Sequence, residues 1–155
     1  MYDKCVKLLQ ERGVTLEDIG DLVLFLQGKY HPEIGMEEIM LTVKGVVAKR
    51  EVQHAIMTGI LIDQIAESNF EMDEQLRMTL MNDESLYGID EVLAYGICNL
   101  YGSIALTNYG YIDREKPGIL ATINEHCAQC NVFLDDIVGA IAASAASKIA
   151  HTHGK

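Results

Sequence analysis

The chain has 155 residues and a formal net charge of −11, a length that fits one domain with a sizeable core. The acidic balance argues against a nucleic-acid partner, which needs clustered Lys and Arg, and against passive adsorption to an anionic membrane. The first residues lack the basic and then apolar segments of a signal peptide, so we expect a cytoplasmic protein with at most peripheral membrane contact.

The composition predicts an all-α fold, a single multihelical globular domain over residues 1–155. Ala, Leu, Ile, Met and Glu are abundant, Trp is absent, and the chain has only two Pro. No internal repeat or linker marks a domain boundary. The four cysteines do not form the disulfide framework of a small secreted protein.

The first half of the chain predicts short amphipathic helices separated by turns. Thr15 is expected to cap the second helix, with Glu17 and Asp18 in its first turn. A turn at Tyr30-His31-Pro32 separates this helix from the next. The expected helices cover residues 2–12, 15–28, 37–47, 52–66 and 71–81.

Residues 89–101 predict the central helix of the domain. The spacing i, i+3, i+4, i+7 is apolar without a miss, and the positions between are also apolar or small. The uncharged stretch continues to Ile112 and is long enough to span a bilayer, but its Asn, Ser, Thr and Gly residues suit lipid poorly. We therefore interpret it as a buried helix followed by a loop over residues 102–110.

The chain then predicts a charged turn at 113–116 and two further helices. Pro117 suits the first position of a helix that should run to about Cys127. Asn131 can cap the last helix, which has small residues and a buried stripe of Leu, Ile and Val. His151 and His153 are expected to be solvated in a C-terminal tail.

Two acidic pairs stand at the starts of apolar helices, Asp90-Glu91 and Asp135-Asp136, and Asp113 lies between them. Compensation of the helix dipole is the simplest reading of one such pair. Arg114 and Lys116 are too few to neutralise five acids, and buried carboxylates are costly unless they are paired or bind a metal. Asp90, Asp113 and Asp136 are therefore predicted to bind Mg²⁺, which prefers oxygen ligands.

The remaining polar residues nearby have predicted roles in catalysis and substrate binding. Adjacent helical residues point about 100° apart, so Glu91 and Asp135 are expected to serve a second metal or to act as a base. Lys116, together with Thr107 and Asn108 in the expected glycine-rich turn, suits the phosphate of an ester.

Three spaced motifs resemble the phosphatidylglycerophosphatase A family. They are Asp90-Glu91, Asp113-x-x-Lys116-Pro117 and Leu134-Asp135-Asp136-Ile137-Val138 followed by a small-residue helix, and the match covers Leu86 to about Ala146. The resemblance implies a multihelical fold and Mg²⁺-dependent removal of the terminal phosphate of phosphatidylglycerophosphate. It implies metal or catalytic roles for the five acids and a phosphate contact for Lys116.

The first half of the chain shows neither the hydrophobic spans nor the early Gly-Thr/Gly-Ser loop of membrane-embedded relatives. The chain therefore resembles a soluble branch of this family, in which the phosphate could belong to a lipid headgroup or to a small molecule.

Alternative functions remain open from the sequence. The same fold could serve as a catalytically silent oligomeric binding module, and the apolar content is compatible with a homo-oligomer. Glu71-x-x-Glu74 resembles one acid pair of the all-α nucleotide pyrophosphohydrolases, but the partner motif is missing. His126, Cys127 and Cys130 could suggest zinc or redox chemistry, yet no second ligand pair of matching spacing exists, and we interpret the thiols as packed side chains.

Overall fold

The computed structural model describes residues 1–125 and 129–154, and this part of the chain is helical without any strand. The predicted all-α class is therefore confirmed. Helix boundaries in the first half agree with the sequence pattern within a few residues. The helices are α1 (Tyr2–Glu11), α2 (Leu16–Gln27), α3 (Met36–Val47), α4 (Arg50–Glu67), α5 (Glu74–Met81), α6 (Ile89–Asn99), α7 (Ser103–Glu115), α8 (Ile119–Ile123) and α9 (Val132–His153).

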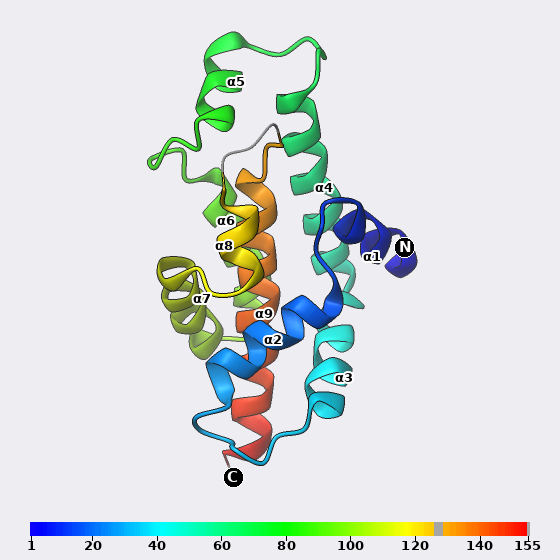
Figure 1. The fold of residues 1–155 in the computed structure, drawn as a ribbon, viewed down its shortest axis with the longest axis vertical. Coiled ribbons are helices and arrows are strands. Elements are labelled where there is room, and N and C mark those ends of the chain that lie inside the picture. The colour runs from blue at the N-terminus through cyan, green and yellow to red at the C-terminus, as the bar shows by residue number, and fades with distance from the viewer. Residues whose placement is uncertain (126–128, 155) are drawn as a thin grey trace.

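The last helix, α9, forms the centre of the molecule. It runs along the long axis, and α2, α3, α4, α6, α7 and α8 pack around it (Figure 1). Every residue from Val132 to Ser147 is buried. Its many Ala residues, with Gly139, Ser144 and Ser147, leave room for several neighbouring helices to approach closely.

The prediction that residues 89–101 form the central helix is wrong. In α6, Ile89, Val92 and Tyr95 are 53%, 60% and 47% exposed. Only Asp90, Ala94, Ile97 and Cys98 of this helix are buried. The bulky apolar residues all around α6 suggested complete burial, but the small residues of α9 allow more neighbours to surround it.

The expected loop at residues 102–110 is also corrected, because α7 occupies this stretch. Gly102, with φ +86°, makes the break before α7, whereas Gly110 lies inside the helix. Ala105, Tyr109 and Ile112 follow helical spacing and are buried, and α7 packs along α9. A helical period was therefore present in this stretch, and the glycines concealed it.

The helix predicted from Pro117 to about Cys127 is shorter than expected, since α8 ends at Ile123. The predicted tail at the other end is helical, because α9 continues to His153. Asn131 holds the N-cap position of α9, but its side chain makes no capping bond. It donates to the Ile123 carbonyl and accepts from Arg12 instead.

Asp63 of α4 caps α9 from outside the helix. Its two carboxylate oxygens accept the backbone N–H groups of Phe133 and Leu134, both at 3.0 Å. Asp63 is fully buried, so these bonds satisfy donors that would otherwise be orphaned at the helix start. The cap fixes the first turn of α9, which carries Asp135 and is followed directly by Asp136.

A second contact holds the segment that leads into α9. Arg12, the residue directly after α1, makes a bidentate ion pair with Glu67, at 2.6 and 3.1 Å. The same guanidinium donates to the Cys130 carbonyl, and the Cys130 N–H donates to Glu67. Because the Arg12 side chain is buried, this is a rigid connection from α1 and α4 to the start of α9.

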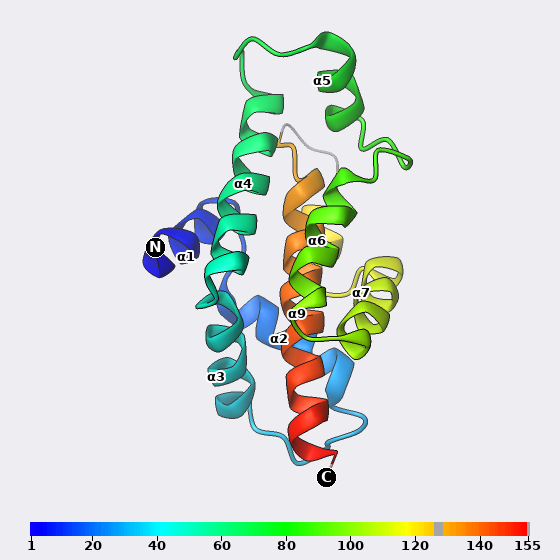
Figure 2. The ribbon, with the colours of Figure 1, turned by 180° about the vertical axis from the view of Figure 1, so that it is seen from behind.

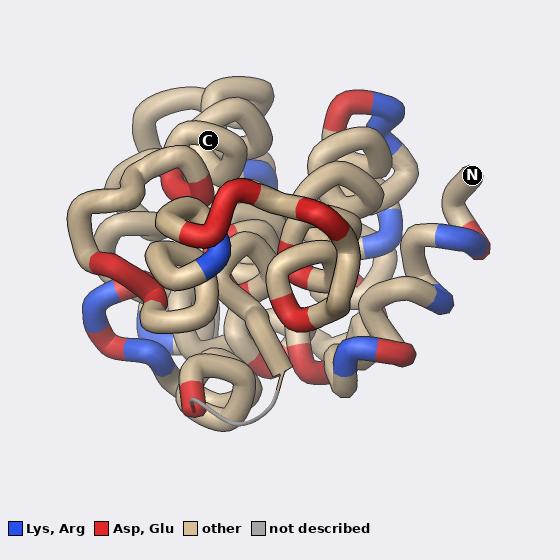
Figure 3. The backbone as a smooth tube through the Cα atoms, turned by 90° about the horizontal axis from the view of Figure 1, so that it is seen from above, with Lys and Arg blue, Asp and Glu red and all other residues tan. Residues whose placement is uncertain are grey.

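From behind, α6 lies in front of the upper part of α9, α4 lies beside it, and α5 lies at one end of the molecule (Figure 2). Viewed along the long axis from that end, acidic residues clearly outnumber basic ones (Figure 3). Within the described residues, no helix combines the length and the apolar character needed to cross a bilayer.

Candidate metal and active site

The five predicted acids come together in space from three helices. Asp90 and Glu91 lie in the first turn of α6, Asp113 lies near the end of α7, and Asp135 and Asp136 lie near the start of α9. The starts of α6 and α9 therefore both contribute carboxylates to one region, where the positive ends of the two helix dipoles favour negative charge.

The acids form two groups that share Asp136. The first group is Asp90, Glu91 and Asp136, and the second is Asp113, Asp135 and Asp136. Within each group, one carboxylate oxygen per residue lies within 4.8 Å of the others. Two overlapping sets of three carboxylates could hold one or two divalent cations with oxygen ligands.

Burial makes this arrangement electrostatically costly. Asp90, Asp135 and Asp136 are only 6%, 7% and 5% exposed. Burial raises the pKa of Asp136 well above the usual range of an aspartate, and the negative charge of Asp135 adds to the effect. Burial likewise raises the pKa of Asp90, and the adjacent Glu91 raises it further.

Lys116 supplies positive charge to one side of the cluster. Its Nζ lies 2.7 Å from Asp113 and 2.6 Å from Asp135. Burial lowers the pKa of Lys116, but the Asp135 charge and the bonds to both carboxylates outweigh this and raise it above the usual range. Burial raises the pKa of Asp135, and Lys116 opposes that shift.

The backbone holds Lys116 in place. Lys116 ends α7 in the left-handed region, at φ +46°, which is unusual for a residue other than glycine. This conformation ends α7 soon after Asp113, and the Lys116 side chain reaches back to contact the Asp113 carboxylate. The Asp113-x-x-Lys116 spacing is thus a helix-end geometry, which the sequence pattern alone did not reveal.

Two buried polar atoms at the cluster fit a cation or a substrate. Glu91 Oε2 is buried and has no hydrogen-bond partner among the described residues. The Tyr109 hydroxyl is also buried, and its nearest polar group is Asp136, although the contact lacks regular hydrogen-bond geometry. Burial raises the pKa of Tyr109, and the nearby Asp136 raises it further, so this hydroxyl stays protonated. Such groups, beside three carboxylates with raised pKa values, are chemically consistent with Mg²⁺ and its water ligands.

The two predicted phosphate-binding residues lie on α7 and not on a glycine-rich turn. Thr107 is exposed, and its hydroxyl donates to the Ser103 carbonyl one helical turn earlier. The amide nitrogen of Asn108 is buried with no described partner. Asn108 therefore retains a free donor, whereas Thr107 is already engaged within its own helix.

Three residues near the site were missed by the sequence reasoning. Tyr109 lies four residues before Asp113 on α7, so a helical reading of 103–115 would have placed both on one face. Asp63 is the only acid in the apolar stretch 52–66 of α4, which is a signal of a buried and paired carboxylate. Asp83, with φ +48°, lines a pocket together with Asp135 and adds negative charge nearby.

The predicted cysteine-containing segment is described only in part. His126 and Cys127 lie outside the described residues. Cys130 is 4% exposed, and its thiol donates weakly to Asp63 and to the Leu80 carbonyl. Burial raises the pKa of Cys130 to about 12, which agrees with the interpretation of this thiol as a packed side chain.

Known proteins of high similarity cover almost the whole chain. Uncharacterized protein YutG of Bacillus subtilis is 57% identical over 97% of this chain and 91% of its own length. Uncharacterized protein YpjQ of the same organism is 48% identical over 99% of this chain and 86% of its own length.

Solved structures share the fold. A protein of unknown function from Bacillus stearothermophilus is 53% identical with a TM-score of 0.95, covering 99% of this chain and 95% of that one. The low temperature requirement C protein from Listeria monocytogenes is 52% identical with a TM-score of 0.95, covering 99% and 97%. The model of the family Phosphatidylglycerophosphatase A matches residues 14–151, which include all five clustered acids and Lys116. The chain therefore belongs to the phosphatidylglycerophosphatase A family.

Proposed function

We propose that this protein is a Mg²⁺-dependent phosphatase that converts phosphatidylglycerophosphate to phosphatidylglycerol. The observation that carries the proposal is the convergence of five acids from three helices into two groups that share Asp136. Favourable interaction with the helix dipoles would account for acids at the starts of two separate helices. It gives no reason for those acids to lie close together in space. Membership of the family supports the phosphatase chemistry and the lipid substrate.

Asp90 and Asp113 belong to different groups, and Asp136 belongs to both. Asp136 would therefore hold one cation together with Asp90, and a second one, where two are bound, together with Asp113. Bound Mg²⁺ would neutralise charge on the phosphate and make a coordinated water more acidic. Glu91 has a buried oxygen without a described partner, and it would accept a proton from the attacking water.

Lys116 would contact a phosphate oxygen, and Asp135 would orient it through the 2.6 Å ion pair. Lys116 would also offset negative charge as it builds up on the phosphate during attack. The Tyr109 hydroxyl, which stays protonated, is available as a further donor beside Asp136. The described residues thus offer an acceptor for the water proton and donors for the phosphate.

The decisive experiment measures phosphate release by the purified protein with Mg²⁺. One arm offers phosphatidylglycerophosphate in detergent micelles, and the other offers soluble phosphomonoesters such as glycerol 3-phosphate. Release from the lipid alone supports the full proposal, and release from soluble esters alone keeps the chemistry but overturns the lipid substrate.

Asp113→Asn is the matching variant, with Glu115→Gln as its control. Glu115 lies two residues away on α7 but pairs with the exposed Arg114 rather than with the cluster. Asp113→Asn should lower kcat/KM by about 100-fold or more and weaken Mg²⁺ binding, as expected for a lost ligand. Equal activity and equal Mg²⁺ affinity in the two variants would refute the proposed site.

The silent binding module predicts a different outcome, since its acids would serve only as caps and polar contacts. A Mg²⁺ titration then leaves the melting temperature unchanged, whereas a functional cation site raises it by mass action. The pyrophosphohydrolase alternative gains no support from the described residues, because Glu71 and Glu74 are exposed and belong to neither acid group.

A further inference from the structure

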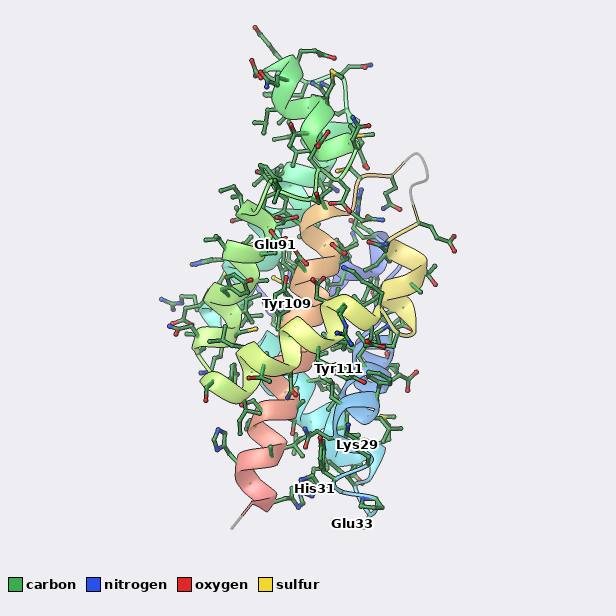
Figure 4. All side chains as sticks on the ribbon, turned by 90° about the vertical axis from the view of Figure 1, so that its left-hand side faces the viewer. Lys29, His31, Glu33, Glu91, Tyr109 and Tyr111 are labelled. Atoms are coloured by element: carbon green, nitrogen blue, oxygen red, sulfur yellow. The ribbon has the colours of Figure 1, made fainter. Side chains whose placement is uncertain are left out.

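A second cluster of metal-binding side chains lies at the opposite end of α9 from the acids. His31 and Glu33 belong to the connection between α2 and α3, and His153 ends α9. One ligand atom from each of these three residues lies within 4.8 Å of the others. Figure 4 shows His31 and Glu33 together at this end of the molecule, far from Glu91 and Tyr109.

The two imidazoles already lie next to each other. The rings of His31 and His153 are 4.9 Å apart at their centroids and tilted by 43°. The Nε2 of His153 lies 2.6 Å from a carboxylate oxygen of Glu38, at the start of α3. Metal-bound histidines commonly use one ring nitrogen for the metal and the other for an orienting carboxylate, and Glu38 occupies that second position. In that arrangement Nδ1 of His153 would bind the metal while Nε2 stays with Glu38.

The donor set distinguishes this cluster from the acid site. Two imidazole nitrogens and one carboxylate suit Zn²⁺ and its transition-metal neighbours, whereas Mg²⁺ prefers oxygen ligands alone. The negative end of the α9 dipole also favours a cation at this position. A set of two His and one Glu leaves a fourth position of a tetrahedral zinc ion for water.

The geometry also separates this cluster from a simple chelate in the C-terminal tail. His151 lies two residues before His153, but it lines a hollow with Leu100, Tyr101, Lys148 and Thr152, on the side of α6. The neighbours of His153 are His31 and Glu38 instead. Binding by the cluster therefore depends on the tertiary fold and not on the sequence His151-x-His153.

We propose that His31, Glu33 and His153 form a binding site for a divalent transition metal, Zn²⁺ by preference, with Glu38 orienting His153. The bound metal ties the α2–α3 connection to the end of α9 and so fixes the two segments at this end of the molecule. The site is independent of the proposed phosphatase function.

Calorimetric titration with Zn²⁺ tests the site, in the presence of excess Mg²⁺ so that the acid cluster is occupied. The wild type should bind Zn²⁺ with a melting temperature that rises on binding. His31→Ala and His153→Ala should each weaken binding by more than about 100-fold, since loss of even an outer-shell partner costs 10- to 100-fold. Far-UV circular dichroism verifies that each variant folds, and Glu33→Gln gives a variant of unchanged shape that should also bind more weakly.

His151→Ala and Asp136→Asn are the matched controls, and both should bind Zn²⁺ as the wild type does. Equal Zn²⁺ affinity in His31→Ala and wild type would overturn the proposal. Equal losses in His151→Ala and His153→Ala, with no loss in His31→Ala, would assign the binding to a tail chelate instead. With Cu²⁺ as a probe, paramagnetic resonance should show coupling to two imidazole nitrogens in the wild type and fewer in His31→Ala.

Discussion

At the scale of single residues, Asp136 is the carboxylate that the two acid groups share. It is 5% exposed. Its pKa is raised by burial and then by the charge of Asp135. An aspartate in this position is stable as a neutral acid or with a cation nearby, and both states can be tested.

The first prediction concerns the pH dependence of stability without metal. The folded-state pKa values of Asp90, Asp135 and Asp136 are raised, and burial raises that of Asp63 to about 7. Acids with a raised folded pKa add stability that is fully present below their unfolded pKa, about 4, and is lost as the pH rises through the folded value. The melting temperature in EDTA should therefore fall from about pH 5 to about pH 8.

Mg²⁺ should flatten this profile, because it binds the ionised carboxylates. Asp136→Asn should also flatten it in EDTA, whereas the exposed substitution Glu115→Gln should leave it unchanged. Thermal unfolding monitored by circular dichroism gives the measurement. A melting temperature in EDTA that rises across this range would contradict the assigned pKa shifts.

The second prediction concerns Lys116, whose charge has opposite effects on metal binding and catalysis. Lys116→Met removes the cation that pairs with Asp113 and Asp135, so Mg²⁺ should bind several-fold more tightly. Phosphate release should nevertheless fall by about 100-fold, since the phosphate loses a charged donor. Calorimetry and a phosphate assay separate the two effects, and weaker Mg²⁺ binding in the variant would argue against the proposed role.

At the scale of helices, the close approach of α4 to α9 depends on Gly59. A Cβ at this position would lie 2.3 Å from Ile137 Cδ1 and 3.0 Å from Phe133 Cβ. The Cδ1 atom of Ile137 can move because it ends a flexible side chain. The Phe133 Cβ is bonded to the backbone of α9 and cannot move without it. Gly59 therefore sets the distance between the helix that carries Asp63 and the helix that it caps.

The third prediction compares two helical glycines. Gly59→Ala should lower the free energy of unfolding by about 1–2 kcal/mol, because overpacking outweighs the gain in helix propensity. Gly96→Ala, in α6 with nothing within 4 Å of the added carbon, should raise it by about 0.5–1 kcal/mol. Urea denaturation of the two variants checks both signs, and stabilisation by Gly59→Ala would mean that α4 and α9 have room to adjust.

The fourth prediction concerns the cap that α4 provides for α9. Asp63→Ala leaves two buried N–H groups of α9 without partners and should cost about 2–4 kcal/mol of unfolding free energy. Asp73→Ala is the control, because Asp73 caps α5 locally and is exposed, and it should cost about 1 kcal/mol. Equal costs in denaturant unfolding would show that α9 does not depend on its partner helix for its first turn.

At the scale of the whole molecule, α9 connects two clusters of different chemistry. Asp136 lies in its first turns and His153 at its end, separated by about 25 Å of helical rise. The acid cluster has only oxygen ligands, and the other cluster has two imidazoles. The same helix thus carries oxygen ligands that suit a hard cation such as Mg²⁺ at one end, and imidazole ligands that suit a borderline cation such as Zn²⁺ at the other.

The fifth prediction follows from this separation. Asp136→Asn should abolish the thermal shift produced by Mg²⁺ and leave the shift produced by Zn²⁺, and His31→Ala should do the reverse. The stability changes of the double variant should add within about 0.5 kcal/mol, as expected for sites more than 10 Å apart. A clear departure from additivity would reveal coupling of the two ends through α9.

The sequence by itself determined the helical class, most boundaries in the first half, and the acids that meet in the candidate site. These features are local, because the helical period, the capping by Thr15 and the acids at helix starts each depend on only a few neighbouring residues. The three motifs identified these acids even though residues 102–110 were predicted to form a loop.

Only the tertiary structure decided which helix is central, how α9 is capped, and that His31 and His153 meet. Each of these depends on residues far apart in the sequence, such as Asp63 with Phe133, or His31 with His153. A local sequence pattern does not say how many neighbours a helix will have. The bulky apolar residues of α6 therefore predicted the central helix, whereas the small residues of α9 place that helix at the centre. Long-range packing set those outcomes, because small side chains let several helices reach α9 at once.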